Sequence, residues 1–170
     1  MKSFYNASFI FGVALFLRIF ASILFGDQIL DHEFDVLVQN MINGNGYTYW
    51  TVLDSGEVTN KFVDNGAYYI PSGYMPILYP LFLTLLTYIF GYGEVHVFAV
   101  LVIQSLMGAI NCFMIRDIYN IKFPNSPSQA ITWFPALFPL HVFMSSQISA
   151  STLYVFLLSA VILFYYKLIS

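Results

Sequence analysis

Charged side chains are scarce in this chain. Only 9% of its 170 residues are Asp, Glu, Lys or Arg, whereas soluble domains carry about 25%. Hydrophobic residues make up 59%. This deficit of charge, together with several long uncharged runs, predicts an integral membrane protein in contact with lipid. The net charge of −3 excludes the basic surface that nucleic-acid binding requires, so we expect no nucleic-acid partner.

Cysteine is also nearly absent. The only one is Cys112, which lies inside an apolar run, and one cysteine excludes a disulfide framework within the chain. We expect it to be a small buried or lipid-facing residue. The acidic residues are present but unevenly spread, because seven of the nine lie between Asp27 and Asp64. This distribution marks one segment of the chain as different from the rest.

Four apolar stretches are long enough to cross a hydrocarbon core of about 30 Å as helices. They cover residues of about 4–25, 95–115, 129–147 and 150–166. Pro135 and Pro139 are expected to kink the third helix, which membrane proteins tolerate. We therefore predict an all-α, polytopic membrane protein in which residues 1–170 form a single membrane module.

Counting basic residues predicts the topology. Residues 76–90 are apolar but too few for a normal span, which favours an interfacial or re-entrant helix. If this stretch does not cross, the basic residues that flank the spans all fall on one side, as the positive-inside rule prefers; they are Lys2, Arg116, Lys122 and Lys167. We expect a cytoplasmic N-terminus in an inner or plasma membrane, with residues 26–94 as one large outer loop.

The acidic start of this loop leads into a short amphipathic helix, predicted over residues 33–42. Its apolar residues follow helical spacing: Phe34, Leu37, Val38 and Met41. Asp31 is a good N-cap, and Gly44 can take the left-handed conformation that ends a helix. Such a helix would lie on the membrane surface. Residues 47–74 are expected to be loop.

Asp31, Glu33 and Asp35 are the leading candidates for chemistry. A carboxylate just above a bilayer can act as a general base, since nearby like charges and low dielectric raise its pKa towards a useful value. The alternative is that these acids only cap and solvate a surface helix. Asp31, His32 and Glu33 together also offer two carboxylates and an imidazole, so a divalent cation is a candidate cofactor.

Three other features have competing interpretations. Arg18 is costly inside a bilayer unless it snorkels or finds a partner; it would hold a lipid phosphate or pair with Asp27 or Asp31. His141 is expected to be structural within the helix bundle. The outer-loop aromatic residues form either an interfacial belt or a surface for stacking sugars or isoprenoids; they are Trp50, Tyr68, Tyr69, Tyr74, Tyr79 and Tyr88.

The order of these features resembles a known family. A first span is followed by an acid, a short helix and Gly44-x-Gly46-Tyr47; then come Pro76-x-x-Tyr79-Pro80-Leu81-Phe82-Leu83 and a span centred on Leu106-Met107-Gly108-Ala109. The arrangement is similar to the N-terminal part of GT-C membrane glycosyltransferases, such as bacterial protein O-mannosyltransferases and aminoarabinose transferases. The motifs are loose and apolar, so their order and spacing carry the resemblance.

The resemblance implies transfer of a sugar from a polyprenyl-phosphate donor to an outer-face acceptor, with inversion at the sugar carbon. It implies a catalytic acid at Asp31 with Glu33 as its neighbour, and a juxtamembrane helix over residues 76–90. We expect substrate contacts from Arg18, Asp35 and Tyr79. Two departures are visible. Ser151 stands where relatives usually carry a second acid, and relatives are several hundred residues long. We expect a fragment, a truncated frame or part of a split protein whose partner chain supplies further helices.

Overall fold

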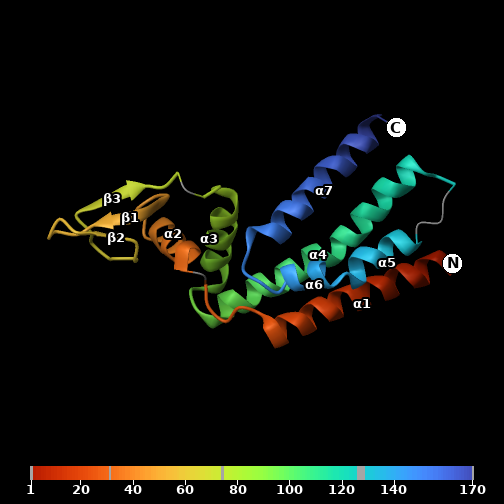
Figure 1. Cartoon of the computed structure of the whole chain (residues 1–170), viewed down its shortest axis with the longest axis horizontal. Helices are drawn as coiled ribbons and strands as arrows, with labels where there is room; N and C mark the ends of the chain where they lie inside the picture. Colours follow the sequence, from red (N-terminus) through yellow and green to blue (C-terminus); the bar gives the residue numbers. More distant parts are fainter. Residues whose placement is uncertain (1, 31, 74, 126–128, 170) are drawn as a thin grey trace. The chain divides into compact units, whose positions relative to one another are not determined.

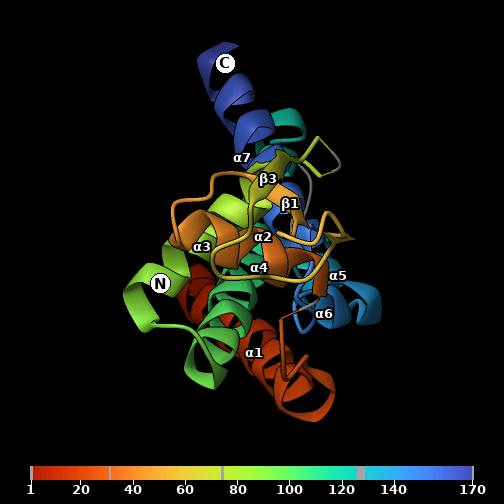
Figure 2. The same ribbon diagram turned by 90° about the vertical axis from the view of Figure 1, so that its left-hand side faces the viewer.

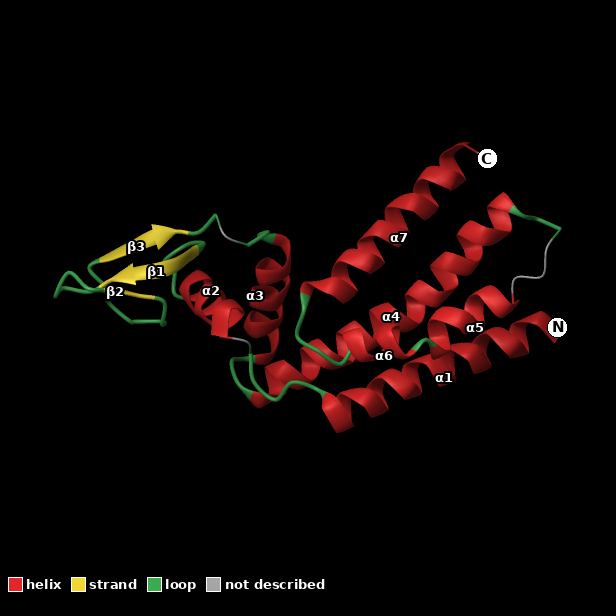
Figure 3. Cartoon of the chain, viewed as in Figure 1, coloured by secondary structure: helices red, strands yellow, loops and turns green. Residues whose placement is uncertain are grey.

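The computed structural model describes residues 2–30, 32–73, 75–125 and 129–169. The chain divides into two compact units. We call residues 1–27 with 101–170 the bundle unit, and residues 28–100 the connecting unit. The elements appear in chain order in Figures 1 and 3: α1 (Lys2–Phe25), α2 (His32–Ile42), β1 (Thr48–Val52), β2 (Val58–Thr59), β3 (Tyr68–Pro71), α3 (Leu78–Phe90), α4 (Glu94–Lys122), α5 (Gln129–Leu137), α6 (Pro139–Met144) and α7 (Ala150–Ile169).

Small side chains let the helices of the bundle unit approach closely. The buried cluster at its centre consists of Ile10, Ala14, Ala109, Cys112 and Ala136 from α1, α4 and α5. Without a hydrophobic driving force between helices in lipid, such small residues stabilise association through close van der Waals packing. Larger rings surround the cluster, and the Phe9 and Trp133 rings pack edge to face at 6.1 Å.

The prolines break the third predicted helix. Pro135 lies inside α5 and Pro139 begins α6, with Phe138 between the two helices in an extended conformation. Proline has no backbone N–H, so Pro139 cannot donate to the carbonyl of Pro135, four residues earlier. The expectation of one kinked helix over residues 129–147 is therefore wrong: two short helices lie there, and both pack along α1 (Figures 1 and 2).

The connecting unit contains a small sheet that the sequence pattern did not predict. Its strand order is β2-β1-β3, with both pairings antiparallel. The residues expected to be loop thus include three strands, so the fold is mostly helical rather than all-α. One face of α2 packs against β1 through Val36, Leu37 and Tyr49, and another part of α2 packs against α3.

Three of the described helices are long and apolar enough to cross a membrane. They are α1 from Ala7 onward, α4 and α7, and they cover the first, second and fourth predicted stretches. The short helix α3 agrees with the interfacial helix expected at residues 76–90. The number of helices long enough to span is therefore three in the described chain, where the sequence predicted four.

Candidate functional site

The acidic segment leads into α2 of the connecting unit. Asp31, the first candidate base, lies outside the described residues, and so does Tyr74. His32 is the first residue of α2, and both Glu33 and Asp35 lie in its first turn. Carboxylates at this position interact favourably with the positive end of the helix dipole. Glu33 is half-buried and has no hydrogen-bond partner in the part of the chain that the structure describes.

Asp35 is held by two polar side chains. Tyr92 donates a short hydrogen bond to Asp35 Oδ1, and Gln39 Nε2 donates to the same oxygen at 2.8 Å. Gln39 Nε2 also lies 3.2 Å from the Tyr92 hydroxyl. Burial, and then the hydrogen bond to Asp35, raises the pKa of Tyr92 to about 12. Asp35 is thus a tether between α2 and the α3–α4 turn, whatever else it binds.

Sequence reasoning did not identify Tyr92, although a signal for it exists. It stands between Gly91 and Gly93, which have φ values of 77° and 132°. Only glycine adopts these conformations readily, so the tight turn sets the direction of the tyrosine between them. Tyr88 adds a second link, because its hydroxyl donates to the carbonyl of Ile42 at 3.5 Å.

The outer-loop aromatic residues separate into buried and exposed groups. Tyr79 is 0% exposed, and its ring packs edge to face on Phe34 at 4.9 Å. It therefore belongs to the core of the connecting unit rather than to a surface that a sugar could contact. Tyr69 is also engaged, since its hydroxyl donates to the carbonyl of Val63 at 3.1 Å.

Two of the exposed aromatic residues, Trp50 and Tyr68, lie on one face of the sheet, whereas the exposed Tyr88 lies on α3. Residues directly opposite one another in an antiparallel pair share a face, and the register pairs Trp50 with Ile70 and Val52 with both Tyr68 and Val58. Trp50, Tyr68 and Val58 are 43%, 61% and 57% exposed. The opposite face is buried at Tyr49 and Thr51. We call the outward set of Trp50, Val52, Val58, Tyr68 and Ile70 the sheet face.

Arg18 is buried in the bundle unit and does not snorkel. It is 1% exposed. Its Nη2 donates to the carbonyl of Pro135 at 2.9 Å, and its Nη1 donates to the carbonyls of Ala14 at 2.9 Å and Ala136 at 3.4 Å. Pro139 leaves the Pro135 carbonyl without its normal helical donor, so the guanidinium replaces the missing N–H at the break between α5 and α6.

One expected partner of Arg18, Asp27, is engaged elsewhere in the bundle unit, and the other, Asp31, lies outside the described residues. Asp27 Oδ2 accepts a hydrogen bond of 2.6 Å from the backbone N–H of Ile148, just before α7. Gly108 flanks the Arg18 side chain, and a Cβ at position 108 would lie 2.5 Å from Arg18 Nε. The predicted pairing of Arg18 with Asp27 is therefore wrong. Its Nη donors serve the fold, whereas Nε has no partner among the described residues.

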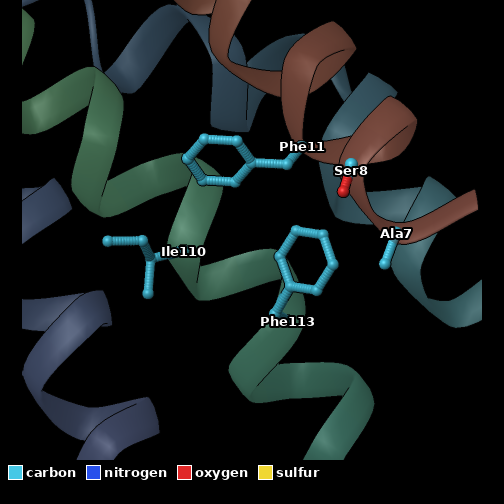
Figure 4. Close-up of a pocket in the computed structure, with 5 residues that line it drawn as sticks. All are labelled: Ala7, Ser8, Phe11, Ile110 and Phe113. Atoms are coloured by element: carbon cyan, nitrogen blue, oxygen red, sulfur yellow. The ribbon is translucent and has the colours of Figure 1, made fainter. Parts of the chain in front are cut away.

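Two cavities of different character lie in the bundle unit. The larger is an apolar groove of about 390 Å³ between α1 and α4, lined by Ala7, Ser8, Phe11, Ile110 and Phe113 (Figure 4). Its described lining contains no charged residue and none of the acidic candidates. Within that lining the Ser8 hydroxyl is the one polar side-chain group, so the groove offers mainly van der Waals contact. The smaller cavity touches His141, which lies within the bundle unit as expected.

No group of three or more His, Cys, Asp or Glu side chains is placed to hold a metal ion within the described residues. The metal site expected at Asp31, His32 and Glu33 depends on a residue outside them and stays a prediction. The described site offers the half-buried carboxylate of Glu33 and the hydrogen-bonded carboxylate of Asp35 on the same helical turn, in the unit that also carries the exposed sheet face.

No known family model, curated protein or solved structure matches the chain.

Proposed function

We propose that the chain is a membrane glycosyltransferase, or the N-terminal piece of one, that takes a sugar from a polyprenyl-phosphate donor. The observation that carries the proposal is the folded connecting unit between two helices long enough to span a membrane. Eight positions separate Phe25 from Glu33, so an extended chain allows at most about 28 Å between them. We take the acids to lie near the membrane surface, where the phosphate of a lipid-linked sugar lies.

The chemistry that suits these residues is a direct displacement. A carboxylate, Asp31 in the first instance, removes the proton from an acceptor hydroxyl. The acceptor oxygen forms a bond to the anomeric carbon while the bond from that carbon to the phosphate oxygen breaks. Polyprenyl phosphate leaves with the bonding electrons, and the anomeric carbon is inverted. Glu33, on the first turn of α2, lies close in sequence to this base and supports its role as a neighbouring acid.

The sheet face supports recognition of a sugar. Trp50 and Tyr68 supply exposed rings, which combine apolar faces with polar edges. Their place on a paired sheet keeps them rigid, so little conformational entropy would be lost on binding. We assign this face to the sugar or the acceptor rather than to the isoprenoid chain.

The orientation that fits this chemistry has the N-terminus in the cytoplasm and the connecting unit outside. Lys2, Arg116 and Lys122 then share the inner side, as the positive-inside rule requires. Lys167 joins them only if the broken pair α5–α6 crosses the membrane as a unit. Single cysteines in a Cys112→Ser background test this, with Ser55→Cys labelled from outside and Asn125→Cys protected. Labelling of Asn125→Cys from outside would overturn the orientation.

The catalytic test uses proteoliposomes that contain radiolabelled polyprenyl-phosphate mannose, glucose or aminoarabinose, with a membrane extract as acceptor. Transfer moves the label out of the organic phase for at least one donor, and Asp31→Asn abolishes it while membrane insertion is unchanged. Asp54→Asn is the matched control, because Asp54 is an exposed acid of the same unit. An active Asp31→Asn variant would exclude Asp31 as the base.

A non-catalytic membrane subunit is the second candidate function. The observation that favours it is the largely exposed α7, on which Leu158, Val161, Phe164 and Leu168 are 61%, 66%, 67% and 76% exposed. Such a surface suits the helices of a partner as well as lipid. This alternative predicts that replacing any single acid of the connecting unit leaves the function of the protein unchanged. It also predicts that the chain transfers no labelled sugar from any of the three donors.

A further inference from the structure

A small cavity lies where three helices of the bundle unit meet. Its volume is about 20 Å³, and its lining comes from α4, α6 and α7: Gly108, Asn111, His141, Met144, Thr152 and Val155. A cavity needs roughly 10–15 Å³ to hold a water molecule, together with two to four polar partners. The size and the lining of this cavity satisfy both conditions.

Two oxygen atoms around the cavity can accept a hydrogen bond from a molecule inside it. Asn111 is 4% exposed, and its Oδ1 has no partner among the described residues. Thr152 Oγ1 uses its proton to donate to the carbonyl of Met144 at 3.1 Å, so towards the cavity its oxygen can only accept. Leaving a buried acceptor without a partner costs about 1–3 kcal/mol. The site therefore suits a small molecule that donates hydrogen bonds to both oxygens.

The charges nearby exclude an ion. Gly108, which lines the cavity, is flanked by Arg18, whose Nε would lie 2.5 Å from a Cβ at that position. A second cation would be repelled by this buried guanidinium. An anion would be attracted by the guanidinium, but it has no proton to donate to Asn111 Oδ1, which lacks a partner among the described residues. A neutral molecule with two donors fits.

We propose that this cavity is a hydration site that holds one ordered water molecule bridging α4, α6 and α7. The water donates to Asn111 Oδ1 and Thr152 Oγ1, and the ring of His141 supplies its third partner. The site gives the six-residue helix α6 a polar connection to α4 and α7, in addition to its packing against α1 and α5; helices this short depend on tertiary contacts. The inference is independent of the glycosyltransferase proposal.

Water-edited solid-state NMR of the full chain in lipid bilayers tests the site directly. Asn111 lies inside a candidate span, so magnetisation transfer from water to its side-chain amide is expected only from a trapped molecule. Asn111→Asp identifies the signal. Val155→Leu adds a methylene to the lining and should abolish the transfer, whereas Val161→Leu, on the exposed side of α7, should retain it.

Two results would overturn the proposal. One is the absence of transfer to Asn111 in the wild-type chain, which would mean that the cavity is empty. The other is undiminished transfer in Val155→Leu, which would mean that the water is not in this cavity. If Val155→Leu does not fold, Thr152→Val replaces it, since removal of one of the three partners should weaken the same signal.

Discussion

The contact between Gly108 and Arg18 leads to a prediction opposite to the usual effect of alanine in a helix. A Cβ at position 108 would lie 2.5 Å from Arg18 Nε and 3.0 Å from its Cδ. The guanidinium beyond these atoms is fixed by carbonyls of α1 and α5 at 2.9 Å. Gly108→Ala must therefore displace Arg18 and break or lengthen these hydrogen bonds.

The two effects of Gly108→Ala have different magnitudes. Alanine in a helix interior is favoured over glycine by about 0.5–1 kcal/mol. Interhelical hydrogen bonds in membrane proteins contribute about 0.6–2 kcal/mol each, and an unpaired buried carbonyl adds to the penalty. Loss of the two interhelical bonds, to the carbonyls of Pro135 and Ala136, outweighs the helix propensity, so we expect destabilisation by about 1–3 kcal/mol. Gly12→Ala is the matched control, since a Cβ at position 12 would meet no atom within 4 Å, and it should stabilise by about 0.5–1 kcal/mol.

Unfolding in mixed micelles, followed by far-UV circular dichroism, gives the free energies. Cys112 supplies a second measurement, because this buried, single thiol reacts with a maleimide only when the bundle opens, and about 1.4 kcal/mol corresponds to a tenfold change in rate. In an Arg18→Ala background, which has no atoms beyond Cβ, the penalty of Gly108→Ala should disappear. The reasoning is refuted if Gly108→Ala is as stable as Gly12→Ala, or if its penalty persists without Arg18.

Two further predictions concern the connecting unit. Tyr92→Phe should destabilise by less than about 1 kcal/mol because the hydrogen bond is exposed. Since burial and Asp35 raise the pKa of Tyr92 to about 12, the stabilisation is fully present below about pH 10 and is lost as the pH rises through about 12. Urea titrations at several pH values measure this loss, and an identical pH dependence of the wild-type and Tyr92→Phe proteins would contradict it. His96 is 0% exposed, and its Nδ1 has no partner among the described residues. Its Nε2 lies 3.2 Å from the carbonyl of Leu83, but this carbonyl also accepts a hydrogen bond of 2.9 Å from the Thr87 hydroxyl and so keeps a partner without His96. His96→Leu should therefore change stability by less than about 1 kcal/mol, whereas His96→Ala should destabilise by about 2–4 kcal/mol through the cavity that it leaves. Thermal unfolding compares the two variants. Equal losses of stability in both would show that the ring nitrogens of His96 matter more than the volume of its side chain.

Hydrophobic run lengths and glycine positions predicted much of the helical structure. Apolar runs longer than about 18 residues have few alternatives to a membrane-crossing helix, which is why α1, α4 and α7 were anticipated. The helical spacing of Phe34, Leu37 and Met41 predicted α2, and Gly44 has the expected positive φ of 81°. The sheet was missed because its short strands alternate irregularly and are interrupted by turn residues, so no periodic signal stands out.

The sequence alone determined that this is a mostly helical, charge-poor chain with its acids gathered between the first two long helices, since run length, periodicity and composition are local properties. Only the tertiary structure decided what the polar residues do. Arg18 has no sequence neighbour that explains it, because its partners include a carbonyl freed by a proline more than a hundred residues later. Asp35 likewise meets Tyr92 across a turn. Hydrogen-bond partners of buried polar groups are set by which helices pack together, and packing is a property of the whole fold.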